Sequence, residues 1–129
     1  MRGRIRVYKA LSDESRLRVL NLLIERECCV CEVMQALEIS QSKASRILRT
    51  LYDVGFLELR KEGLWSLYSI NWDGMDAYLK RIVDATREAL KGDKQMEMDR
   101  ENLRKAKRVG PGSIKEMRHR RLASEAAQP

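Results

Sequence analysis

The chain has 129 residues, of which 43% are hydrophobic, so it can form one folded core but hardly two domains. Charged residues make up 35% of the sequence, and the formal net charge is +7 at pH 7. A positive protein is expected to meet a polyanion, either nucleic acid or an anionic membrane surface. No segment reaches the roughly 20 apolar residues of a membrane span, and residues 1–16 lack the apolar core of a signal peptide. We therefore expect a cytoplasmic protein without membrane contact, in a compartment that keeps thiols reduced.

The first half of the chain predicts short amphipathic helices. Ser12 is a helix-start signal, and apolar residues at helical spacing predict a helix over 13–26, with a shorter helix before it. The spacing i, i+3, i+4, i+7 predicts another helix from Val30. This pattern breaks at 38–40, and a further helix opens after Ser40. Two short helices joined by about four residues are typical of a helix-turn-helix.

Strand character follows these helices. Residues 56–70 predict two strands around a turn at Glu62-Gly63, which together form a hairpin. Residues 73–91 are predicted to be helical, and their broad apolar stripe exceeds what a small domain needs for its own core. That excess indicates packing against a partner helix.

The helix after Ser40 has a polar face rich in cations, and no acidic residue occurs between Ser40 and Tyr52. Cations suit phosphates and guanine edges, whereas amide and hydroxyl groups suit other base edges. A solvated face would explain this helix equally well if it stood alone. A helix-turn-helix followed at once by a basic-tipped hairpin is a winged helix, however, and this context favours a helix that reads double-stranded DNA. The predicted DNA-contacting residues are Gln41, Ser42, Lys43, Ser45, Arg46 and Arg49 on the helix, with Arg60 and Lys61 at the hairpin tip.

All three cysteines, Cys28, Cys29 and Cys31, lie in one short stretch. In a reducing compartment an odd cluster favours metal binding or redox chemistry over a structural disulfide. Thiolates select soft, thiophilic ions, and trivalent arsenic and antimony accept three sulfurs. Burial as small apolar residues and a redox switch are the alternatives. Since helical residues turn by about 100°, Cys28 and Cys31 are expected to share a helix face, with Cys29 and Cys31 nearly opposite each other. Three-sulfur binding would then require a distorted helix start.

Three stretches, LSDESRLRVLNLL, ISQSKASRILRTLYDVGFLELRKEGLWSLYSI and CVCEV, resemble the ArsR/SmtB family of metal-responsive repressors over about residues 5–91. The resemblance implies a dimeric winged helix-turn-helix in the order α-α-α-α-β-β-α, whose affinity for DNA falls when metal binds. It places the first and last helices at the dimer interface. The dimerisation residues expected on this basis are Ile5, Tyr8, Met75, Tyr78, Leu79, Ile82 and Val83.

The cysteine box is similar to the arsenic-type box of this family, which implies arsenite or antimonite as inducer. In the best-known arsenic responders a third cysteine lies one helical turn after the second, where this chain has Met34. Cys28 is therefore assigned as the third ligand beside Cys29 and Cys31. Cadmium-type sites need N-terminal cysteines, which residues 1–27 lack. Zinc-type sites on the last helix need paired histidines, which the chain also lacks.

The sequence thus predicts a homodimeric repressor that leaves its operator when the thiols capture arsenite. One alternative is a redox-sensing DNA-binding regulator that uses the same thiols. Another is a winged-helix module for protein contacts in a transcription complex. An enzyme is least expected, because no set of acid, base and nucleophile occurs. Residues 1–91 are the predicted DNA-binding and dimerisation domain, and 92–129 a basic extension that is partly helical and then, from residue 113, disordered.

Overall fold

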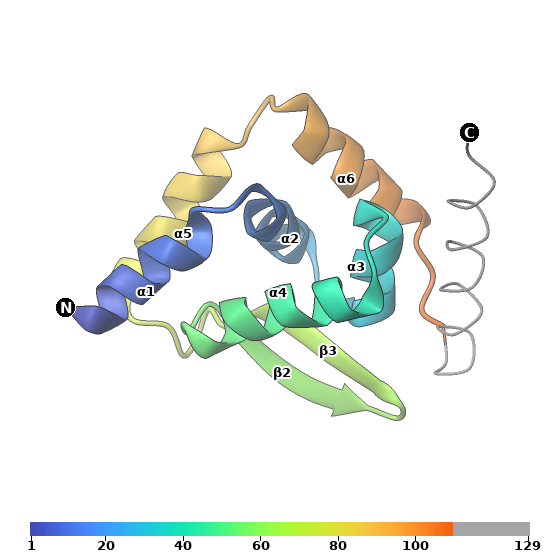
Figure 1. The fold of residues 1–129 in the computed structure, drawn as a ribbon, viewed down its shortest axis with the longest axis horizontal. Helices are drawn as coiled ribbons and strands as arrows, with labels where there is room; N and C mark the ends of the chain where they lie inside the picture. Colours follow the sequence, from blue (N-terminus) through green and yellow to red (C-terminus); the bar gives the residue numbers. More distant parts are fainter. Residues whose placement is uncertain (110–129) are drawn as a thin grey trace.

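The computed structural model describes residues 1–109, which form a mainly helical body with a β-hairpin at its lower edge (Figure 1). The elements in chain order are α1 (Arg2–Leu11), α2 (Glu14–Glu25), β1 (Cys28–Cys29), α3 (Val30–Leu37), α4 (Gln41–Asp53), β2 (Leu57–Glu62), β3 (Trp65–Ile70), α5 (Ala77–Ala89) and α6 (Lys94–Lys105). The expected winged helix-turn-helix is confirmed, with β1 and α6 in addition to the predicted order. The tail predicted to be disordered from residue 113 lies outside the described residues. Across 1–109, no helix has both the length and the apolar character needed to cross a membrane.

Capping residues fix where α2 and α4 begin. The Asp13 carboxylate caps α2 by accepting a hydrogen bond from the backbone N–H of Arg16 at 2.9 Å. The Ser40 hydroxyl caps α4 in the same way, through the N–H of Lys43 at 3.1 Å. Between them, α3 ends at Leu37, and the next residue, Glu38, has a left-handed backbone (φ 56°) that turns the chain toward α4. The short link 38–40 therefore brings the two helices together as the sequence indicated.

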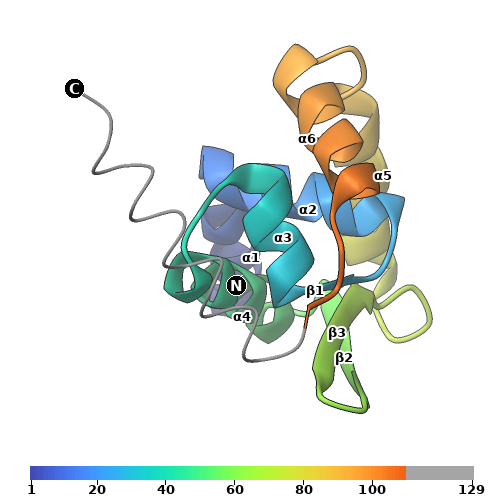
Figure 2. The ribbon, with the colours of Figure 1, turned by 90° about the vertical axis from the view of Figure 1, so that its right-hand side faces the viewer.

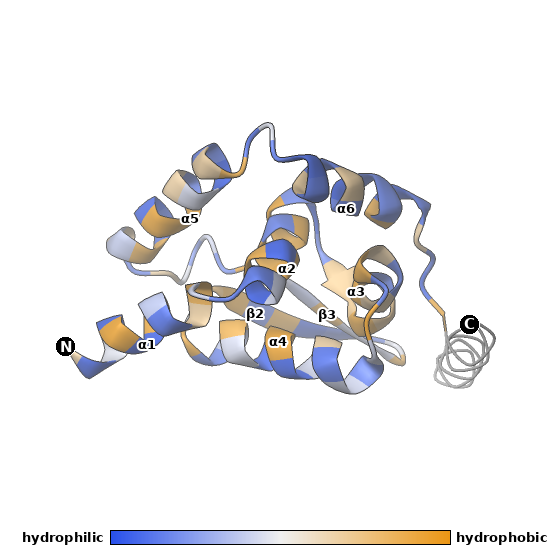
Figure 3. Cartoon of the chain, turned by 45° about the horizontal axis from the view of Figure 1, so that its top comes forward, coloured by the Kyte–Doolittle hydropathy of each residue, from blue (hydrophilic) through white to orange (hydrophobic). Residues whose placement is uncertain are grey.

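The main core lies around α2, which runs through the middle of the body in Figure 1. Apolar positions of α2, α3 and α4 turn inward, while α6 is mostly hydrophilic (Figure 3). Full burial of each large apolar side chain contributes about 1.5–3 kcal/mol. The largest fully buried apolar side chains include Phe56, Leu20, Leu22, Leu48 and Leu51.

β3 is the central strand of a three-stranded antiparallel sheet, in the order β1-β3-β2 (Figure 2). Cys28 pairs with Tyr68 and Cys29 with Leu67, and Leu67 also pairs with Arg60 of β2. Side chains alternate across a strand, so Cys28 and Cys29 face opposite sides of the sheet.

The tip of the hairpin differs from the prediction. Glu62 still pairs with Trp65, so the loop has only two residues, Gly63 and Leu64. Gly63 has φ 58°, a left-handed value that favours glycine. Arg60 and Lys61 consequently lie within β2 rather than at the tip.

Helix α6 packs against α2 and α3. Its side chains Met96 and Leu103 are buried, and so is the carboxylate of Asp99. Two nitrogens of Arg18 on α2 donate to this carboxylate at 2.8 and 2.9 Å, which compensates for its removal from water. The described part of the predicted extension therefore packs on the domain predicted for residues 1–91.

Leu103→Ala tests whether α6 is docked in solution. Leu103 is fully buried, so its truncation should lower the free energy of unfolding by about 2–5 kcal/mol. Met98→Ala on the same helix is the matched control, because Met98 is 59% exposed and should change stability by no more than about 0.5 kcal/mol. Urea unfolding measures both, and equal stability of the two variants would show that α6 is not docked.

Candidate nucleic-acid interface and cysteine site

Helix α4 buries one face and exposes the other. Lys43 and Arg46 are exposed, on the side of α4 that does not face the core. A hollow of about 290 Å³ separates them from the start of α2, where Ser15 and Arg16 line the opposite wall. Sequence reasoning missed these two residues, because they belong to another helix. The other predicted residues of this face lie as expected: Gln41 and Ser42 are exposed, and Ser45 is half-buried.

Arg49 is exposed but engaged within its own helix. Its guanidinium pairs with Asp53 at 3.0 Å and lies 5.8 Å from the ring centre of Tyr52. An exposed pair of this kind contributes at most about 1 kcal/mol. Arg49 can therefore exchange Asp53 for a phosphate at little cost.

Arg60 connects the wing to the segment before β1. It donates to both carboxylate oxygens of Glu27 at 2.7 and 2.8 Å and pairs with Glu62 at 3.0 Å. The hydrogen bond with Glu27 raises the pKa of Arg60 and lowers that of Glu27. Lys61 donates to Ser66 across the hairpin at 2.8 Å. Both predicted wing cations thus have protein partners, and their contact with DNA stays a prediction.

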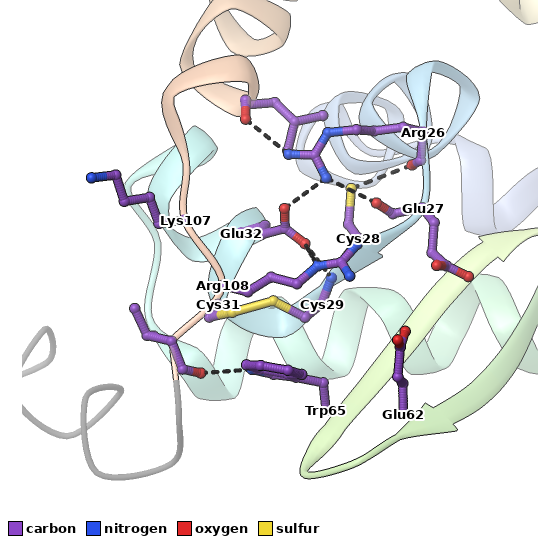
Figure 4. A network of polar contacts seen from close by, with 12 residues as sticks. Arg26, Glu27, Cys28, Cys29, Cys31, Glu32, Glu62, Trp65, Lys107 and Arg108 are labelled. Carbon is purple, nitrogen blue, oxygen red and sulfur yellow. Dashed lines mark hydrogen bonds and ion pairs between the residues drawn. A yellow bond between two sulfur atoms is a disulfide. The ribbon is translucent and has the colours of Figure 1, made fainter.

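Cys29 and Cys31 come together at the start of α3, where a disulfide joins their sulfurs and their Cα atoms are 5.4 Å apart (Figure 4). Cys29 precedes the helix in extended backbone, with φ −87° and ψ 168°. The expectation that these two face opposite sides of a helix is wrong, because only Cys31 is helical. Their sulfurs meet without any unwinding of α3.

Cys28 is directed into the main core, where its thiol donates to the carbonyl of Arg26 at 3.4 Å. Burial raises the pKa of Cys28 to about 12. Cys29 and Cys31 belong to a separate cluster with Leu67. The expected shared face of Cys28 and Cys31 is wrong, because Cys28 lies in a strand. Within 1–109, no group of three or more His, Cys, Asp or Glu side chains is placed to hold a metal ion, and the three-cysteine ligand set stays a prediction.

Glu32 is buried beside the cysteine box, with only 3% of the residue exposed, and it holds the box through polar contacts. Its carboxylate accepts the backbone N–H of Cys29 at 3.0 Å, and it pairs with Arg26 at 2.6 Å and Arg108 at 3.0 Å (Figure 4). Hydrogen bonds to an ionised group are the stronger kind. Sequence reasoning missed this role, although an acid three residues after a helix start is a capping signal.

Comparison with known proteins decides the family. A family model described as "Bacterial regulatory protein, arsR family" matches residues 13–58. An arsenic resistance transcriptional regulator of Pseudomonas putida is 45% identical over 94 residues, which cover 67% of this chain and 71% of the relative. The chain belongs to the ArsR family. Since the members are transcriptional regulators, this ArsR-family protein is a DNA-binding repressor and not an enzyme.

Two further similarities agree with this family. An arsenical resistance operon repressor of Escherichia coli is 41% identical over 81 residues, covering 62% of this chain and 68% of the relative. A solved homodimeric winged helix-turn-helix DNA-binding domain from Mycobacterium bovis, a possible ArsR-family regulator, has a TM-score of 0.59 at 27% identity. The match covers 71% of this chain and 82% of that domain.

The predicted dimer residues fall into two groups. α1 and α5 lie on the same side of the ArsR-family chain, and the guanidinium of Arg4 is 5.8 Å from the ring centre of Tyr78 (Figure 1). Ile5 and Tyr8 are 46% and 63% exposed, so α1 offers an apolar surface. Tyr78 and Ile82 are half-buried. The remaining three are buried in the chain's own core, and their part in a dimer interface stays a prediction: Met75, Leu79 and Val83.

Lys43→Ala and Arg46→Ala should each weaken operator binding without changing the fold, since both side chains are exposed. Loss of a phosphate contact lowers affinity for all sequences and reduces the salt slope by about one, whereas loss of a base contact costs about 1–3 kcal/mol at one position. Lys91→Ala removes the same charge beyond α5, where Lys91 pairs with Glu88, and should bind like the wild type. Salt titrations of operator affinity measure all three, and unchanged affinity in both α4 variants would contradict the assignment.

Proposed function

We propose that this chain is a homodimeric repressor that binds operator DNA in the reducing cytoplasm and releases it when its cysteine box captures arsenite or antimonite. One observation carries the proposal: the sulfurs of Cys29 and Cys31 meet at the start of α3, which packs directly on α4. Arsenic regulators among the similar proteins support the choice of inducer.

The chemistry of the box suits a thiophilic ion. Reduced thiolates are soft ligands that prefer such ions to magnesium or calcium. The start of a helix favours negative charge, because its free N–H groups point toward that end. Binding displaces thiol protons, so the response should weaken as the pH falls. The disulfide is the oxidised form of the pair and must be reduced before an ion can bind.

Transmission to DNA follows from the position of α3. A metalloid placed between two sulfurs must separate them, which moves Cys29 relative to Cys31 and displaces the first turn of α3. That turn is fixed by Glu32, and the helix behind it packs on α4. A ligand that favours one of two arrangements couples two sites. To lower the fraction of repressor bound to DNA from 99% to 1%, the metalloid must bind the DNA-free form more favourably by about 5.5 kcal/mol.

Cys28 would join as the third ligand only after β1 separates from β3, because its thiol faces the core. Its raised pKa of about 12 opposes the required deprotonation. Cys28→Ser therefore discriminates between a two-sulfur and a three-sulfur site. If this variant responds more weakly to arsenite, β1 rearranges to bring Cys28 to the ion. If its response is unchanged, only two protein sulfurs bind the ion.

A redox-sensing regulator is the second candidate, favoured by the disulfide between Cys29 and Cys31. A peroxide would oxidise the two thiols to the disulfide and itself be reduced to water, with both thiol protons passing to the products. Parallel titration of the operator complex with arsenite and peroxide separates the candidates, because only the effective reagent releases DNA.

Cys29→Ser and Cys31→Ser should bind operator like the wild type but no longer release it on adding arsenite. A hydroxyl is a hard ligand and cannot replace a thiolate for a soft ion. An operator mobility assay with arsenite titrated measures release, and X-ray absorption on the arsenite complex counts the sulfurs. Release that persists in both variants would refute the proposed inducer site.

Tyr8→Glu should weaken dimerisation, because Tyr8 is an exposed apolar residue of α1 and a buried charge at an interface is costly. Operator binding should fall in parallel, since a dimer must hold two half-sites about 34–36 Å apart. Met98→Glu, on the exposed face of α6, is the control. Sedimentation measures both, and a wild-type chain that stays monomeric at micromolar concentration would contradict the dimer.

A further inference from the structure

The residues directly after α6 run across the cysteine box (Figures 2 and 4). We call residues 106–109 the strap. Its backbone is fastened at Lys107, whose N–H donates to the Gln35 side chain at 3.0 Å and whose carbonyl accepts from the same amide at 2.7 Å. That amide also donates to the carbonyl of Cys31 at 2.9 Å. One side chain of α3 therefore holds both the strap and the box.

Two further contacts fasten the end of the strap. Arg108 pairs with the buried carboxylate of Glu32 at 3.0 Å. The indole N–H of Trp65, in β3, donates to the carbonyl of Val109 at 2.9 Å. The strap is thus bound to α3, which starts at the cysteine box, and to β3, which pairs with the cysteine strand β1.

The strap covers the two reactive sulfurs. Cys29 and Cys31 are 2% and 1% exposed, and Trp65 and Val109 pack against the cluster that contains them. A thiol-reactive molecule must approach a sulfur directly, so it cannot react while these groups are in place. The fastening side chains are only partly covered, with the Arg108 side chain 33% exposed. Such segments open locally without unfolding of the whole domain.

We propose that the strap controls access of thiol-reactive molecules to Cys29 and Cys31, with Arg108 and Trp65 as the residues that hold it closed. The proposal deepens the proposed function and rests on it only for the identity of the physiological reagent. Opening of the strap is the step that precedes capture of an ion. Arg108 and Trp65 are positioning residues, because neither is a ligand.

The test measures thiol reactivity of the reduced full-length protein with 5,5′-dithiobis(2-nitrobenzoate), a bulky disulfide reagent, without DNA or arsenite. One thiolate of the box displaces a coloured thionitrobenzoate and forms a mixed disulfide. The second thiolate attacks that bond, closes the Cys29–Cys31 disulfide and releases a second coloured ion. Cys28, which is fully buried in the main core, gives a separate slow phase.

Arg108→Ala removes the ion pair, and Trp65→Phe keeps a ring but removes the N–H donor. Each should accelerate the fast phase about tenfold, the factor for loss of one net hydrogen bond. Arg104→Ala is the matched control, because Arg104 lies on α6 and pairs with Glu25 and Glu101 rather than with the box. It should react like the wild type.

Two outcomes would contradict the proposed role of the strap. One is an unchanged fast phase in both variants. The other is a parallel acceleration of the Cys28 phase, which would indicate unfolding of the whole domain rather than local opening. Because the assay contains neither DNA nor arsenite, a failure of arsenite to release the operator leaves its result unchanged. Equally, a result that contradicts the role of the strap does not affect the arsenite experiment.

Discussion

The buried carboxylate of Glu32 joins parts of the chain that are separated by as many as 76 positions. It binds the backbone of Cys29, the guanidinium of Arg26 after α2 and that of Arg108 in the strap. Burial removes the water that would solvate its charge, so these donors alone make the position favourable. The first turn of α3, and with it the cysteine box, depends on this cluster.

Under the proposed function, that dependence gives the cysteine box a physical route to the surface of α4. α3 receives the ionic cluster at its first turn and packs on α4. The exposed cations Lys43 and Arg46 lie on α4, the helix on which α3 packs. Packed cores have discrete arrangements rather than continuous ones, so under the proposed function a displaced helix start would favour release of DNA over a graded loss of affinity.

Local signals in the sequence predict most of the fold. Caps such as Asp13 and Ser40, together with apolar periodicity, determine the helices, and residues 56–70 determine the hairpin. β1 is too short for any periodic pattern, so the extended backbone of Cys29 could not be foreseen. The docking of α6 depends on long-range pairs such as Arg18 with Asp99, which local spacing does not reveal.

The same limit applies to the candidate site. Exposure of the cationic face of α4 follows from its periodicity, because its apolar residues must face the core. The pairing of Arg60 with Glu27 cannot be read from periodicity, because Glu27 becomes its neighbour only when the three strands assemble. The broad stripe of α5 indicated a partner helix, yet Leu79 and Val83 are covered within one chain. Periodicity shows that a face is apolar but not which surface covers it.

The order β1-β3-β2 places the cysteine strand and the wing in one sheet. Cys29 pairs with Leu67, and Leu67 pairs with Arg60 on its other side. The strand pairing of the sheet therefore connects the cysteine strand to the wing without passing through a helix. A tilt of β1 either carries β3 and β2 with it or breaks the pairing. Under the proposed function, a chemical event at the sulfurs would then reach the wing through the sheet as well as α4 through α3.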